Sequence, residues 1–181
     1  KIRSGGWEKR MGRLLTGKTV GIVGMGTIGK RLVTLLRSFN CKVLATDHVT
    51  DIEFAKENNL EFVQLNELLR DSDIVTLHLP LDNDTKDLFD TNLFMQMKEG
   101  AIFINTSRGK IVDEDALFDA LSCGKIGHAC LDVFRNEPYV GKLKELDNVT
   151  LTCHVGSYAK EARVAMERQA VENLLKGLVG S

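Results

Sequence analysis

The sequence contains little proline, little tryptophan and no long apolar run. Two prolines and one tryptophan occur in 181 residues. No apolar stretch comes near the ~20 residues that a membrane-spanning helix needs, and no basic segment followed by an apolar one opens the chain. These absences argue against a membrane span and a secretion leader, so we expect a cytoplasmic protein with no membrane partner.

A net charge of one sign is also lacking. The 24 Lys and Arg residues nearly balance the 25 Asp and Glu residues, which leaves a formal charge of -1, and the basic residues are scattered along the chain. Surfaces that bind nucleic acid gather their basic residues in a stripe or run. The composition therefore predicts no nucleic-acid partner.

The cysteines are few and isolated. Cys41, Cys123, Cys130 and Cys153 form no CxxC pair and stand in apolar or strand-like surroundings. Metal sites and disulfide frameworks use closely spaced cysteines, whereas isolated cysteines usually behave as small buried thiols. We therefore predict no metal site and a reducing compartment.

Short β-branched or apolar segments alternate with segments of helical spacing. This alternation is typical of βαβ units around a parallel sheet, and the nearly continuous apolar segments indicate strands buried on both faces. The sequence thus predicts the α/β class, as a Rossmann-type doubly wound parallel sheet in three layers, α/β/α. The expected strands are Thr19–Val23, Lys42–Ala45, Ile74–Leu77, Ala101–Ile104, Gly127–Leu131 and Val149–Leu151, and the expected helices are Ile28–Phe39, Asn66–Asp71, Glu114–Cys123 and Ala159–Leu175.

The segment Val23–Arg31 fits two glycine motifs. One is GxGxxG, the dinucleotide-binding turn, and the other is most of GxxxxGK, the triphosphate-binding loop. A triphosphate loop needs Ser or Thr after its lysine, where this chain has Arg31. A dinucleotide turn needs a strand before it, a helix after it and an acid at the end of the next strand, and all three are present. We therefore expect a dinucleotide site at Gly24, Gly26, Thr27, Ile28 and Gly29.

Asp47 is the acid that completes this motif. It follows the expected strand Lys42–Ala45 by two residues and stands eighteen residues after Gly29. A carboxylate there accepts the ribose hydroxyls and repels a 2′-phosphate, which favours NAD over NADP. His48 weakens this preference slightly, because a neighbouring histidine could contact a phosphate.

Three further polar stretches follow expected strands and contain Arg108, Glu137 and His154. In open α/β sheets, ligands bind at the carboxyl ends of the strands, so these side chains should meet the cofactor. A guanidinium suits the carboxylate and carbonyl of a 2-keto acid, and an imidazole can exchange the proton of the alkoxide. A carboxylate beside the imidazole fixes its tautomer and favours its charged form, the role expected of Glu137.

Over nearly its whole length, the chain resembles the D-isomer-specific 2-hydroxyacid dehydrogenase family. The resemblance implies that Arg108, Glu137 and His154 are the catalytic trio and that Asp132 contacts the nicotinamide amide. It also places His78, Pro80, Thr106, His154 and Gly156 in the cofactor site, and it implies a small 2-hydroxy or 2-keto acid as substrate and a homodimer. The matching blocks are GGWEKRMGRLLTGKTVGIVGMGTIGKR, LHLPLDNDTKDLF, MKEGAIFINTSRGKIVDEDAL, HACLDVFRNEP and NVTLTCHVGSYAKEA.

The chain departs from the family in two respects. Cys153 stands where the family usually has a proline before the catalytic histidine. In addition, sequence of the substrate domain is missing on both sides, and the chain begins at Lys1 instead of a methionine. We therefore expect residues 1–181 to be an NAD-binding domain excised from a longer enzyme and to turn over substrate poorly by itself. The alternative is an NAD-sensing module without catalysis, similar to corepressors of this fold.

Overall fold

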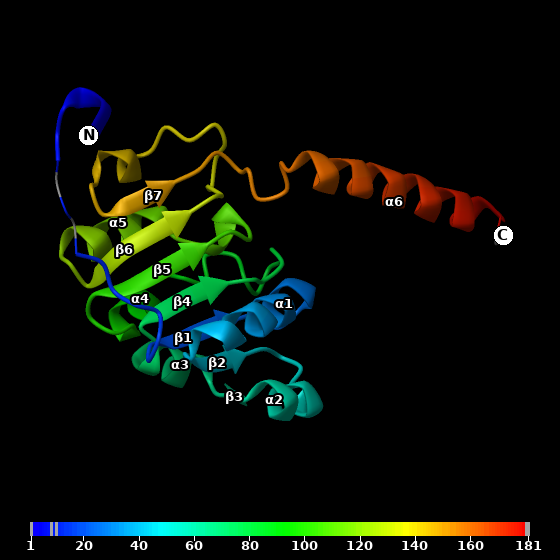
Figure 1. The fold of residues 1–181 in the computed structure, drawn as a ribbon, viewed down its shortest axis with the longest axis horizontal. Coiled ribbons are helices and arrows are strands. Elements are labelled where there is room, and N and C mark those ends of the chain that lie inside the picture. Colours follow the sequence, from blue (N-terminus) through cyan, green and yellow to red (C-terminus); the bar gives the residue numbers. More distant parts are fainter. Residues whose placement is uncertain (1, 8, 10, 180–181) are drawn as a thin grey trace.

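The computed structural model describes residues 2–7, 9 and 11–179. Seven parallel strands form one sheet in the order β3-β2-β1-β4-β5-β6-β7 (Figure 1). This arrangement confirms the predicted α/β class and its doubly wound parallel sheet. The strands are β1 (Thr19–Val23), β2 (Lys42–Thr46), β3 (Leu60–Phe62), β4 (Ile74–Leu77), β5 (Ala101–Asn105), β6 (Ile126–Leu131) and β7 (Val149–Leu151).

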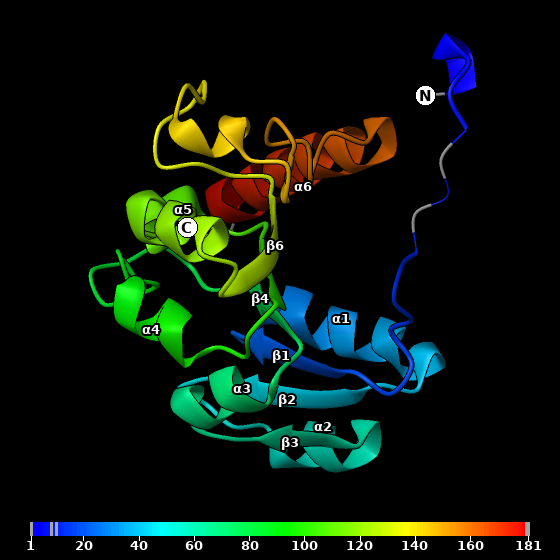
Figure 2. The same cartoon turned by 90° about the vertical axis from the view of Figure 1, so that its left-hand side faces the viewer.

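Helices cover the sheet from both sides, as the three-layer prediction requires. Helices α1 and α2 lie on one face, and α3, α4 and α5 lie on the other (Figure 2). Helix α6 extends away from the sheet as a single exposed helix (Figure 1). The helices are α1 (Thr27–Leu36), α2 (Ile52–Asn58), α3 (Leu65–Asp71), α4 (Thr91–Gln96), α5 (Glu114–Ser122) and α6 (Lys160–Val179). None of these helices, within the described ranges, is long and apolar enough to cross a membrane.

All six predicted strands and all four predicted helices are present, with small changes at their ends. The prediction missed β3, α2 and α4, which have three, seven and six residues. Elements this short carry little periodicity, although Asp51 and Asp90 cap the two helices with side-chain acceptors. Asp113 caps α5, since its carboxylate accepts the amide hydrogens of Asp115 and Ala116.

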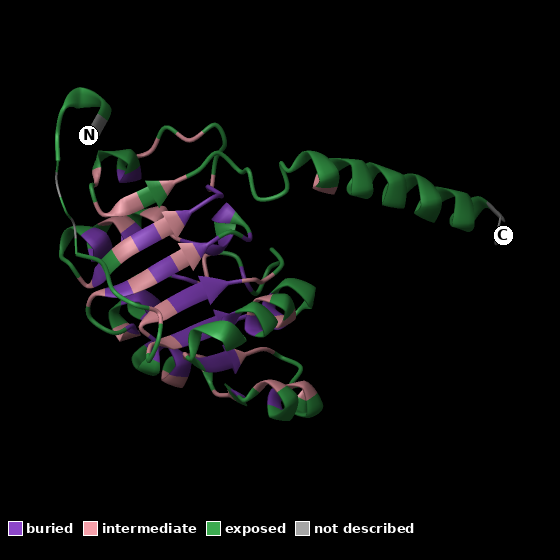
Figure 3. Cartoon of the chain, in the orientation of Figure 1, coloured by how far each residue is buried: buried purple, intermediate pink, exposed green. Residues whose placement is uncertain are grey.

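The expectation that the strands are buried on both faces holds only for part of the sheet. Most residues of β1, β2 and β4 are buried, whereas in β5 buried and half-buried residues alternate. Figure 3 shows this alternation as bands along β5 and β6. The reason is that α1 and α2 cover only the β1–β3 side of their face, and no described helix covers β5 there.

Two apolar cores secure the strand ends that form the site. The core under α3, α4 and α5 contains three buried phenylalanines, Phe89, Phe94 and Phe103, whose ring centroids lie 5.1 to 5.9 Å apart. The core under α1 contains Ile22 and Val33. The chain leaves β1 and β4 toward opposite faces of the sheet, which opens a crevice between their carboxyl ends.

Candidate active site

The glycine turn packs directly against the end of β4. Gly24 has a φ of +99°, and a Cβ atom at this position would lie 2.7 Å from the carbonyl oxygen of His78. A Cβ at Gly29 would lie 2.3 Å from the carbonyl oxygen of Gly24. Any larger residue at either position would force the turn off the sheet. The first and third glycines of the motif are therefore required by backbone packing alone.

The second glycine leaves open space where a phosphate can approach. Gly26 is the N-cap of α1, no side chain caps this helix, and, apart from Gly26 and its two chain neighbours, no described residue comes within 4 Å of a Cβ built at Gly26. The first backbone amide with a partner inside the helix is that of Lys30, which donates to the Gly26 carbonyl oxygen at 3.0 Å. The uncapped amides at Thr27 and Ile28 suit an anion, so the turn fits a pyrophosphate group.

Asp47 lies beside this turn, at the end of β2. Its carboxylate accepts the backbone amide of Met25 at 2.6 Å and that of Val49 at 3.2 Å. Both residues and Asp47 line a hollow of about 610 Å³ that also includes Gly26. Each carboxylate oxygen retains a lone pair that a ribose hydroxyl can use.

Lys30 does not lie free above the turn, as a triphosphate loop would require. Its ammonium pairs with Asp51 at 2.5 Å and lies 5.3 Å from the centre of the Phe54 ring. Together with Arg31 in the position of the magnesium-binding hydroxyl, this pairing argues against the triphosphate interpretation.

His78 and Pro80 follow β4 on the other side of the crevice. The His78 ring is half-buried and lies 3.1 Å from the hydroxyl of Thr76. Burial lowers the pKa of His78, which favours the neutral form of the ring. The carbonyl oxygen of Pro80 accepts the Thr85 hydroxyl at 2.8 Å, which fixes the loop that follows β4.

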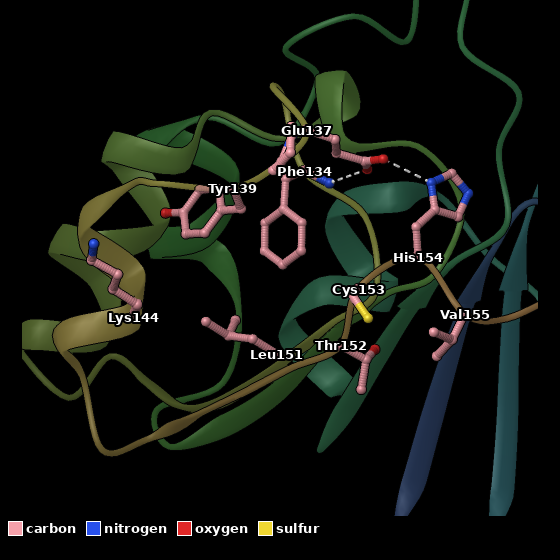
Figure 4. A pocket seen from close by; sticks show the side chains of 10 residues that line it. Phe134, Glu137, Tyr139, Lys144, Leu151, Thr152, Cys153, His154 and Val155 are labelled. Carbon is pink, nitrogen blue, oxygen red and sulfur yellow. Dashed lines mark hydrogen bonds and ion pairs between the residues drawn. The ribbon is translucent and has the colours of Figure 1, made fainter.

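Glu137 and His154 form a hydrogen-bonded pair (Figure 4). His154 Nδ1 lies 2.9 Å from Glu137 Oε2, and Glu137 Oε1 accepts the backbone amide of Phe134 at 3.0 Å. The hydrogen bond from His154, followed by that from Phe134, lowers the pKa of Glu137. Glu137 is therefore ionised at neutral pH and accepts the Nδ1 proton, which leaves Nε2 of His154 available to a substrate.

His154 has a left-handed backbone, which its neighbours hold in place. Its φ is +54°, a conformation that costs free energy for any residue with a side chain. The buried Asp132 carboxylate accepts the Thr152 hydroxyl at 2.5 Å and the amides of Val155 and Gly156 at 2.9 Å each. Asp132 thus binds the chain on both sides of His154, and Gly156 takes part through its amide.

Replacing Asp132 by asparagine should destabilise the fold in a pH-dependent way. Burial by itself would raise the pKa of Asp132, but the hydrogen bonds from Thr152, Val155 and Gly156 outweigh it, and the pKa lies below its ordinary value of 3.8. A lowered pKa means that the ionised carboxylate stabilises the folded chain above pH 3.8, and that this contribution disappears as the pH falls through the lowered pKa. We expect a loss of about 2 kcal/mol at neutral pH, measured by urea unfolding.

The stability lost in Asp132→Asn should become smaller below pH 3.8. There, Asp132 of the unmodified chain is protonated in the unfolded state before it is protonated in the folded state, so the unmodified chain loses stability too. Asp71→Asn, which removes a carboxylate with an exposed side chain, serves as the control. A cost for Asp132→Asn that stays constant from neutral to acidic pH would contradict this assignment of the hydrogen bonds.

Arg108 lies at the same edge of the sheet but does not contact the Glu137–His154 pair. Its side chain is exposed, and its guanidinium donates to the carbonyl oxygen of Ser107 at 2.7 Å. The structure therefore brings Glu137 and His154 into contact, whereas the guanidinium of Arg108 bonds to the backbone of the preceding residue. Thr106, in the same turn, is exposed.

The turn that carries Arg108 nevertheless packs on the loop that carries Glu137. A Cβ atom at Gly109 would lie 1.9 Å from the carbonyl carbon of Phe134. Asn105 shapes the same turn, because its Oδ1 accepts from Ser107 and its Nδ2 donates to the carbonyl oxygen of Arg108 at 3.0 Å. Asn105, Gly109 and Thr152 were not among the predicted site residues. An asparagine at a strand end with a serine two residues later could have indicated such a turn.

A hollow of about 890 Å³ opens beside His154 (Figure 4). The rings of Phe134 and Tyr139 stack in its wall with centroids 4.3 Å apart, and Leu151 and Cys153 contribute to its lining. The exposed Cys153 precedes His154 without hydrogen-bonding to it. The hydrogen bonds that position His154 and the backbone around it come from Glu137 and Asp132.

A glycine turn between a strand and a helix of a parallel sheet, with a histidine–carboxylate pair at the same strand edge, is typical of a dinucleotide-binding domain. Residues 1–156 match the family model described as "D-isomer specific 2-hydroxyacid dehydrogenase, NAD binding domain", and the chain belongs to this family. NAD is the cofactor of this domain family and fits the turn at Gly26. Glu8 and Arg10, within the first matching sequence block, lie outside the described residues.

Individual relatives agree with this family. A glyoxylate reductase of Pyrococcus horikoshii is 41% identical over 96% of this chain and 55% of its own length. A crystal structure of a glyoxylate reductase from Paecilomyes thermophila is 33% identical with a TM-score of 0.90, over 97% of this chain and 54% of that one. An NAD-complexed enzyme of the same family from Lactobacillus delbrueckii is 28% identical with a TM-score of 0.85, over 94% and 56% of the two chains. The chain thus spans about half the length of these relatives.

Proposed function

We propose that this chain is the NAD-binding part of an oxidoreductase that interconverts D-2-hydroxy acids and 2-keto acids. The observation that carries the proposal is the 2.9 Å hydrogen bond between Glu137 and His154, at the strand edge that also holds the dinucleotide turn. A packed histidine of purely structural origin would not need an ionised, half-exposed carboxylate beside it at the edge of a hollow.

Each side chain of the site is proposed to have a separate role in the reaction. Bound NAD supplies or takes the hydride. His154 gives a proton from Nε2 to the forming alkoxide during reduction and takes it back during oxidation, while Glu137 holds Nδ1. Arg108, which is exposed and has only a local contact, is free to turn toward the substrate carboxylate. Asp132 positions His154 and is also proposed to contact the nicotinamide amide, together with the loop residues His78, Pro80, Thr106 and Gly156.

The 2-keto acid would be bound only in a longer protein. The relatives are nearly twice as long, so we propose that residues 1–181 work together with a substrate domain and bind NAD alone without appreciable turnover. We also propose a homodimer in the cytoplasm. The four free cysteines are compatible with a reducing compartment. The sensor alternative is not favoured, because relatives of this chain are reductases and dehydrogenases.

Calorimetric titration of the chain should show NADH binding more tightly than NADPH by at least about tenfold, with no detectable ATP binding. The physical reason is that the Asp47 carboxylate accepts ribose hydroxyls but repels a 2′-phosphate. Replacing Asp47 by alanine should weaken NADH binding and reduce the ratio of NADH affinity to NADPH affinity. Tighter binding of NADPH or ATP than of NADH by the unmodified chain would refute the cofactor assignment.

A further inference from the structure

A half-buried ion pair lies next to Asp47 and was not part of the predicted cofactor site. Lys30 comes directly after the third glycine of the turn, on the first turn of α1, and Asp51 is the N-cap of α2. Their side chains meet at 2.5 Å, each is less than two-fifths exposed, and both line the same hollow as Asp47. The pair thus connects the two helices at the side of the crevice where the ribose of a dinucleotide would lie.

Acidic side chains outnumber basic ones around this hollow. Lys30 is the one cationic residue among the described residues that line it, and Asp47, Asp51 and Glu53 are acidic. A 2′-phosphate carries about two negative charges, and in this hollow an unpaired ammonium would be its natural partner. That ammonium already forms an ion pair with Asp51, and it also lies 5.3 Å from the centre of the Phe54 ring, within the range of a cation–π contact.

We propose that Asp51 is a second determinant of cofactor choice: it disfavours NADP because its ion pair with Lys30 keeps that ammonium from binding the 2′-phosphate. This inference rests on the proposed function, because it assumes that the ribose binds at Asp47. Asp47 repels the 2′-phosphate directly, whereas Asp51 acts through Lys30 by removing the cation that would attract it. The same hydrogen bond to Lys30 lowers the pKa of Asp51, so the pair stays ionised at neutral pH.

The two oxygens of Asp51 perform different tasks, which allows a clean test. Oδ1 accepts the backbone amide of Phe54 and caps α2, while Oδ2 pairs with Lys30. Asparagine is as good an N-cap as aspartate, so Asp51→Asn should keep the helix and lose only the charge. The double variant Asp51→Asn with Lys30→Met then removes the freed cation as well.

The experiment is a titration of NADH and NADPH into the chain and into these variants. Asp51→Asn should bind NADPH about tenfold more tightly, with NADH affinity changed less than about twofold, because only the 2′-phosphate gains a partner. The double variant should return to the NADPH affinity of the unmodified chain. Glu61→Gln breaks the exposed ion pair with Lys42 at the far end of β2 and serves as the charge-matched control without effect.

The outcomes separate the two proposals. If the unmodified chain binds NADH but Asp51→Asn leaves the ratio of NADPH to NADH affinity unchanged, the role of Asp51 is overturned and the proposed function stands. A gain for NADPH that persists in the double variant, or appears equally in Glu61→Gln, overturns it as well. If the unmodified chain binds neither dinucleotide, both proposals fail together.

Discussion

Replacing Gly109 by alanine is expected to cost about 3 kcal/mol or more of folding free energy, a larger effect on stability than that of Asp132→Asn. The added methyl would lie 1.9 Å from the Phe134 carbonyl carbon and 2.0 Å from its oxygen, and backbone atoms cannot move aside as a flexible side chain can. The turn of Arg108 and the loop of Glu137 must separate. In thermal unfolding, we expect the Tm to fall by about 10 °C.

Gly12→Ala is the matched control for this substitution. Apart from Gly12 and its two chain neighbours, no described residue comes within 4 Å of a Cβ built at Gly12, and the φ of Gly12 is not positive. The Tm of Gly12→Ala should therefore stay within about 2 °C of that of the unmodified chain. A Gly109→Ala variant as stable as Gly12→Ala would mean that the two loops are not in contact in solution.

Loss of His154 is expected to have the largest effect on catalysis. In the longer protein, His154→Ala should slow the turnover of a 2-keto acid at saturating substrate by about 10²- to 10⁴-fold, because the alkoxide then has no proton donor. Binding of NADH should weaken far less than the rate falls, since the Gly24–Gly29 turn is formed by other elements. The measurement is NADH absorbance under saturating substrate, accompanied by calorimetric NADH titration.

Three further variants separate the proton transfer from backbone effects. His154→Asn keeps a residue that tolerates the left-handed backbone and should be as inactive as His154→Ala. Glu137→Gln retains a hydrogen-bonding side chain without its charge and should lose less activity while shifting the pH profile. His128→Asn, at a histidine that bonds to Thr150 outside the site, should keep the rate. An active His154→Ala enzyme would exclude the proposed role of His154.

The glycine turn illustrates what could be predicted from local sequence. Gly24, Gly26 and Gly29 have fixed spacing, and the strand before them and the helix after them show clear patterns, so the motif needed no tertiary information. Glu137 and His154 each follow an expected strand, and parallel strands all end at the same edge of a sheet. The sequence therefore predicted that both residues lie at that edge. Short elements such as β3 and α4 were missed, since a few residues show no reliable period.

The sequence by itself therefore determined the fold class, the glycine turn and the strand edge at which Glu137 and His154 lie, because these depend on periodicity and on residues near one another in the chain. Tertiary structure alone decided which groups touch. Only folding brings Gly109 against Phe134, Asp132 against the amides around His154, and Asp51 against Lys30. Such contacts join residues separated by 21 to 25 positions, and their distances depend on how strands and loops pack, which no local pattern encodes.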